Sequence, residues 1–184
     1  MLASEYGFSV LLPQLMIQQG WALVHLGMVE EGFDQISRAL ALQPQTGVPR
    51  HLFRRLLADV YLSAKRADDG LRAIGEGLRD LEGGKRQWDH AELYRLKGEL
   101  LLLQNTSSAT EAESCFREAI GIAQRQQAKS WELRATMSLA RLLATQGHRD
   151  EAHTMLTGVY GWFTEGFDTA DPKDAKALLD ELAG

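Results

Sequence analysis

The chain has 184 residues, with 20 Lys and Arg against 25 Asp and Glu, and its formal net charge is −5 at pH 7. This acidic balance argues against nucleic acid or an anionic membrane surface as the main partner. One Cys excludes an internal disulfide, and no apolar run reaches the roughly 18 residues of a membrane span, so we expect a soluble, cytoplasmic protein.

Proline, glycine and acidic residues divide the chain into predicted helices. Pro13 fits the first turn of an opening helix that ends at Gly27. Further helices are expected at 30–43, 49–64, 68–83, 88–104, 110–127, 129–146, 149–160 and 172–182. Asp171 is the expected capping residue of the last helix, with Pro172 at its first position. The whole chain is therefore predicted to be helical.

Small residues recur at a regular interval along these helices. They come in pairs separated by 12 to 14 residues: Gly20 with Gly32, Ala58 with Gly70, Gly98 with Ala112, and Ala140 with Ala152. Four residues beyond each second member stands a large apolar residue: Ile36, Ile74, Phe116 or Leu156. Because helices cross closely only where side chains are small, the pattern predicts four helix pairs, each with one tight crossing. A periodic stack of helix pairs is a solenoid, an architecture that mostly binds and seldom catalyses.

These columns resemble the tetratricopeptide repeat, with two extra residues in the loop at 104–110. The resemblance implies an all-α, right-handed superhelical solenoid of four antiparallel helix pairs, which we expect to be a single domain over 1–184. Its units would lie at about 9–44, 48–83, 87–127 and 129–163. A capping helix over 172–182 would cover the end of the stack. Its apolar face consists of Ala175, Leu178, Leu179 and Leu182.

Segments 88–100, 126–134 and 160–168 carry a narrower resemblance. They are similar to the C-terminal repeat module of large bacterial proteins, in which the repeats follow a signal-transduction ATPase. A class III nucleotide cyclase or a winged-helix DNA-binding domain often precedes that ATPase. The resemblance implies a non-catalytic interaction module that regulates an attached or separate ATPase or cyclase. The expected partner is a protein or peptide, including a domain of the same polypeptide, and a homo-oligomer is compatible with this reading.

The first helix of each predicted pair should line a concave groove, with its outward residues set by helical spacing. The candidate binding residues are Trp21, His25, Arg55, Asp59, Glu92, Arg95, Glu99, Arg134 and Arg141. One interpretation pairs Arg55 with Asp59, and Arg95 with Glu99, within their helices. The other reserves the arginines for a partner. An alternative function is a sensor that binds a small anionic metabolite or peptide in the same groove, with Trp21 as a stacking surface.

The five His residues lack the spacing of a zinc site, and residues 83–86 lack the spacing of a phosphate-binding loop. We therefore expect that the protein is not an enzyme and that it binds no metal or cofactor.

Four aromatic residues gather near the C-terminus: Tyr160, Trp162, Phe163 and Phe167. We expect their rings to pack between the last repeat and the terminal helix, since such a cluster is costly to leave in water. The alternative is a contact surface for another subunit or domain.

Overall fold

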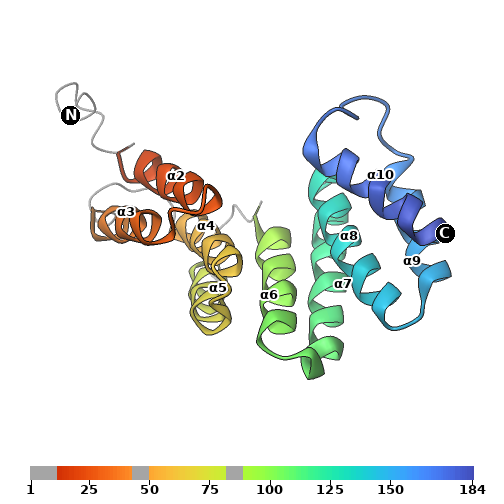
Figure 1. Ribbon diagram of the computed structural model, residues 1–184, viewed down its shortest axis with the longest axis horizontal. Coiled ribbons are helices and arrows are strands. Elements are labelled where there is room, and N and C mark those ends of the chain that lie inside the picture. The colour runs from red at the N-terminus through yellow and green to blue at the C-terminus, as the bar shows by residue number, and fades with distance from the viewer. Residues whose placement is uncertain (1–11, 43–49, 82–88) are drawn as a thin grey trace. The chain divides into compact units, whose positions relative to one another are not determined.

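The computed structural model describes residues 12–42, 50–81 and 89–184. Over these residues it contains nine α-helices, one short 3-10 helix and no strand (Figure 1). The first four helices are α2 (Leu12–His25), α3 (Val29–Leu42), α4 (Arg50–Ser63) and α5 (Ala67–Leu81). They are followed by α6 (His90–Gln104), η2 (Thr106–Ser108), α7 (Ala109–Arg125), α8 (Lys129–Thr145), α9 (Arg149–Tyr160) and α10 (Ala170–Ala183). The predicted helix boundaries at 43, 49, 83 and 88 lie outside the described residues.

The chain divides into two compact units, Met1–Gln87 and Trp88–Gly184. In the first unit α2 packs against α3 and α4, and α4 packs against α5. In the second, α6, α7, α8 and α9 pack in sequence, α6 also contacts α8, and α10 lies against α8 and α9. The predictions of an all-α fold and of helices packed in chain order are confirmed. A single domain over 1–184 stays a prediction.

Glycine permits the closest helix contacts in both units. A Cβ added to Gly20 of α2 would lie 2.6 Å from Ile36 Cγ1 and 2.7 Å from the carbonyl oxygen of Gly32. A Cβ added to Gly98 of α6 would overlap the ring of Phe116 and lie 2.8 Å from its Cδ1. Phe116 is fully buried, so the ring has no free space to enter. The predicted tight crossing with a large apolar residue beside it is confirmed in these two helix pairs.

Each of four turns contains one residue in the left-handed conformation. The residues are Gly27, Lys65, Gln127 and Gly147, with φ angles of 85°, 57°, 55° and 87°. In each turn the next residue donates its N–H to a carbonyl five positions back, as His148 does to Leu143 at 2.9 Å. This closure satisfies carbonyl groups that a helix end leaves without partners. Glycine adopts the conformation freely, whereas Lys65 and Gln127 bear the steric cost of a Cβ.

The connection between α6 and α7 differs from these turns. Asn105 adopts an extended backbone, and its side-chain oxygen accepts the N–H of Ser107 at 3.0 Å. The following residues form η2 and lead directly into α7. The predicted polar insertion at 104–110 is therefore a capped surface turn that lengthens the hairpin without separating α6 from α7.

Helix α10 covers the end of the second unit. The predicted apolar face, Ala175, Leu178, Leu179 and Leu182, is at most 9% exposed and therefore confirmed. The helix begins at Ala170, with Thr169 as the extended residue before it, so the prediction of Asp171 as its cap is wrong. The Thr169 hydroxyl donates to the Gly166 carbonyl at 2.7 Å and holds the preceding loop. Asp171 instead accepts a hydrogen bond from Arg134.

The aromatic residues before α10 are only partly covered. Trp162 is 58% exposed and Phe167 44% exposed, so the prediction that all four rings are packed is wrong for these two. Each exposed ring contacts one nearby aromatic ring. Trp162 meets Phe163 edge-on with ring centroids 5.4 Å apart, and the ring centroids of Phe167 and Tyr160 are 5.7 Å apart. Both exposed rings lie in the segment between α9 and α10, whereas α8 and α9 pack directly against α10.

Candidate functional site

Most of the predicted site residues of the second unit lie on the facing sides of α6 and α8. Helix α6 contributes Glu92, Arg95 and Glu99, which share one helix face because they are three and four residues apart. Helix α8 contributes Arg134 and Ser138, also four residues apart. Since α6 contacts α8 directly, these polar side chains meet between the two helices. We call this surface the α6–α8 face.

Glu92 is the centre of an ion-pair network on this face. Its carboxylate accepts hydrogen bonds from Arg95 Nε and Nη2 at 2.9 and 2.8 Å, and from Arg134 Nη1 at 3.3 Å. The Nε of Arg134 donates to Asp171 of α10 at 2.8 Å. Only 4% of the Glu92 side chain is exposed. A carboxylate this deeply buried is tolerated because two guanidinium groups satisfy it.

The pKa of Arg134 is raised within this network. Burial alone would lower the pKa of Arg134, but its hydrogen bond to Asp171 and the attraction of Glu92 and Asp171 outweigh burial and raise the pKa. Arg95 pairs with Glu92 and more loosely with Glu99, whose Oε1 lies 3.4 Å from Nη1. The interpretation that pairs Arg95 with Glu99 is confirmed. The interpretation that reserves the arginines for a partner stays a prediction.

A pocket of about 440 Å³ opens at one end of the α6–α8 face. Its lining residues come from α6, η2, α7 and α8, together with the residue that follows α8: Glu99, Leu102, Thr106, Ala109, Ser138, Arg141, Leu142, Thr145 and Gln146. The Ser138 hydroxyl donates to Glu99 Oε1 at 2.6 Å and closes the end nearest the ion-pair network. Arg141 is exposed and forms no ion pair with any residue in the described ranges. We call this cavity the Arg141 pocket.

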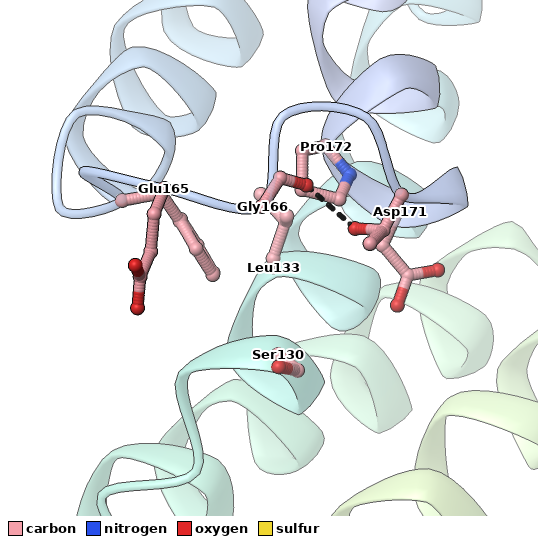
Figure 2. A pocket seen from close by; sticks show the side chains of 8 residues that line it. Ser130, Leu133, Glu165, Gly166, Asp171 and Pro172 are labelled. Atoms are coloured by element: carbon pink, nitrogen blue, oxygen red, sulfur yellow. Dashed lines mark hydrogen bonds between the residues drawn. The ribbon is translucent and has the colours of Figure 1, made fainter.

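A second, smaller cavity of about 210 Å³ lies where α8 meets the start of α10 (Figure 2). Ser130 and Leu133 line it from α8, Glu165 and Gly166 from the loop, and Asp171 and Pro172 from α10. Typical ligand sites have volumes of about 300–1,000 Å³, so this cavity is small for an organic ligand. Of its two carboxylates, Glu165 and Asp171, the second is already paired with Arg134. Of these two cavities, the Arg141 pocket has the volume of a ligand site.

The predicted residues of the first unit form a separate polar cluster. Trp21 Nε1 donates to Asp59 Oδ2, and the ring of His25 stacks on Trp21 with centroids 4.1 Å apart. His25 Nδ1 lies 2.9 Å from the Trp21 carbonyl, which can only accept, so Nδ1 carries the proton and Nε2 accepts from Ser63 at 3.2 Å. His25 thus already occupies part of the Trp21 surface that was predicted to stack on a ligand.

The predicted ion pair between Arg55 and Asp59 is wrong. No ion pair joins them among the described residues, because Asp59 accepts from Trp21 on the neighbouring helix. The Nε of Arg55 is buried and has no hydrogen-bond partner in the described ranges.

The predicted site residues did not include Ser138 and Leu142, which line the Arg141 pocket. Their spacing of four and eight residues from Arg134 would have placed both on the same face of α8.

No group of three or more His, Cys, Asp and Glu among the described residues could hold a metal ion. None of the described helices combines the length and apolar character that crossing a bilayer requires. Comparison with known proteins found no matching family model, no matching curated protein and no matching solved structure. The resemblance to the tetratricopeptide repeat therefore stays a prediction from the sequence.

Proposed function

We propose that the chain is a tetratricopeptide-like module that binds a protein segment on the α6–α8 face of its second unit. The Arg141 pocket carries this proposal, because its volume of about 440 Å³ falls in the range of ligand sites. Its wall combines apolar residues with a cation that has no ion pair in the described part of the chain. The neighbouring Arg95 and Arg134 are held by ion pairs. Binding beside preorganised side chains costs little conformational entropy.

The narrower resemblance extends this proposal to a regulatory role. In this regulatory role, the right-handed solenoid contacts a bacterial signalling ATPase or nucleotide cyclase. That partner is either a domain of the same polypeptide or a separate cytoplasmic protein. The net charge of −5 supports a protein partner over nucleic acid. A non-catalytic role agrees with the pairing of Glu92, Arg95 and Arg134, whose charges stabilise one another.

A sensor for a small anionic metabolite is the second candidate. It is favoured by the guanidinium of Arg141, which has no ion pair within residues 12–42, 50–81 and 89–184, because arginine binds carboxylates and phosphates through parallel hydrogen bonds. The two functions use the same pocket. They differ in whether the ligand extends beyond it along the α6–α8 face.

Selection of random peptides on the immobilised chain, followed by calorimetric titration, tests the proposed function. Leu102→Glu places a charge on the pocket wall and should weaken the selected peptides by about tenfold or more. Leu15→Glu is the matched control, because Leu15 is 53% exposed on α2 of the first unit. Peptides that bind Leu102→Glu with unchanged Kd would place the site elsewhere. Failure to select any peptide, together with thermal stabilisation by anionic metabolites, would favour the sensor.

A further inference from the structure

We infer that the Arg141 pocket recognises an internal acidic residue that neighbours a large apolar residue in a protein partner. The inference rests on the proposed function and adds the chemistry of the ligand to it. Three properties of the pocket carry the argument: the balance of its charges, the apolar part of its wall and the exposure of its rim.

Arg141 is the charged residue of the pocket lining that forms no ion pair among the described residues. Glu99 is the one acidic residue in the lining, and its Oε1 accepts from Ser138 Oγ at 2.6 Å and from Arg95 Nη1 at 3.4 Å. Glu99 therefore has partners within the α6–α8 face. Arg141 has no such partner among the described residues. Its guanidinium has five N–H donors in a planar fork, which matches the two oxygens of a carboxylate.

The wall next to Arg141 suits an apolar side chain. Leu142 is buried, and Leu102 and Ala109 are half-buried at the surface of the pocket. Apolar surface of this kind gains free energy when a ligand displaces water from it. A carboxylate on Arg141 and an apolar group on Leu102 and Leu142 can come from adjacent residues of one peptide.

The rim of the pocket favours an internal segment over a chain end. Thr106 and Gln146 border the pocket and are exposed, so a peptide backbone can enter and leave past their side chains. Arginine is also the single cation of the lining, which matches one side-chain carboxylate. The side chain and the terminal group of an acidic C-terminal residue would together present two anions to it.

Charge reversal at Arg141 tests this specificity. Random peptides are selected on the full chain, on Arg141→Glu, and on Arg38→Glu, which reverses an exposed arginine of α3 in the first unit. The parent and the control should enrich Asp or Glu next to Leu, Ile, Phe or Met. Arg141→Glu should instead enrich Lys or Arg and bind the parent's peptides about tenfold or more weakly. The inference would be overturned if the selected peptides lacked an acidic residue, or if they bound Arg141→Glu as tightly as the parent. Either result would leave the proposed function standing.

A small probe separates failure of the inference from failure of the proposed function. Phenylbutyrate joins one carboxylate to one apolar ring, and phenylbutylamine replaces that carboxylate with a cation. In NMR titrations of the full chain, phenylbutyrate should shift the amides of Ser138, Arg141 and Leu142, and the amine should bind about tenfold more weakly. If phenylbutyrate shifts these amides but no peptide is selected, the ligand of the pocket is a free amphipathic acid and not a protein segment. That result would overturn both the inference and the proposed function. No response to either probe or peptide would overturn both.

Discussion

The contact between Gly98 and Phe116 determines how closely α6 and α7 approach. A Cβ at Gly98 would lie 2.8 Å from Phe116 Cδ1, whereas carbon atoms pack at about 3.5–4.0 Å. The ring is fully buried, so either the ring or the helix must move by roughly 1 Å in Gly98→Ala. Overpacking of this kind costs about 1–3 kcal/mol. Replacing glycine inside a helix returns about 1 kcal/mol, so we expect a net destabilisation of about 0–2 kcal/mol.

Gly121→Ala is the matched control, because the nearest atom to an added Cβ on α7 is the flexible Arg125 Nη1 at an ordinary 3.4 Å. This variant should gain up to about 1 kcal/mol of unfolding free energy. Urea unfolding followed by circular dichroism measures the difference between the two variants, which we expect to be about 1–3 kcal/mol. Adding Phe116→Leu to Gly98→Ala should recover part of the loss through a favourable coupling energy. Equal stabilities of Gly98→Ala and Gly121→Ala would refute the tight crossing.

Three further predictions concern a turn, a histidine and the terminal helix. Gln127→Gly should raise the free energy of unfolding in urea by roughly 0.5–1 kcal/mol, because Gln127 has a φ of 55°, and a loss of stability would contradict strain at this turn. Burial lowers the pKa of His90 below 6.5, so the unfolded chain binds the proton first. Its contribution to stability should therefore be lost as the pH falls below about 6.5, and melting temperatures of His90→Gln should vary less between about pH 7.5 and 5.5 than those of the parent. An equal slope in both proteins would remove His90 as the cause. Deleting the residues after Asp171 should uncover the surface beneath Leu178 and Leu179 and produce dimers or aggregates in size-exclusion chromatography, whereas a monomer of unchanged stability would show that α10 is not a cap.

Local rules were sufficient for much of the fold. The spacing from Gly20 to Ile36 and from Gly98 to Phe116 predicted the two close crossings, because a helix approach depends on side-chain volume at one position. The apolar face of α10 could likewise be predicted from the helical period. Helix starts were less certain, since Thr169 and Asp171 are both capping residue types and only the loop geometry selects Thr169.

Residues of the candidate site could be placed on helix faces, but their partners could not. Spacing within one helix predicted pairs four residues apart, and Arg95 with Glu99 is such a pair. Asp59 shows the limit of that rule, because it accepts from Trp21 on α2 and not from Arg55. A neighbouring helix brings donors to distances that sequence separation does not express.

The amino-acid sequence was enough to predict the helical class, the places where helices come close, and the faces on which polar and apolar residues lie. Tertiary structure alone decided that Arg134 bridges Glu92 and Asp171, which are 42 and 37 positions away along the chain. It also decided that Arg141 stays unpaired among the described residues beside a pocket. The reason is that helical periods arise from local backbone geometry, whereas ion pairs and cavities depend on the distances and desolvation that packing between helices creates.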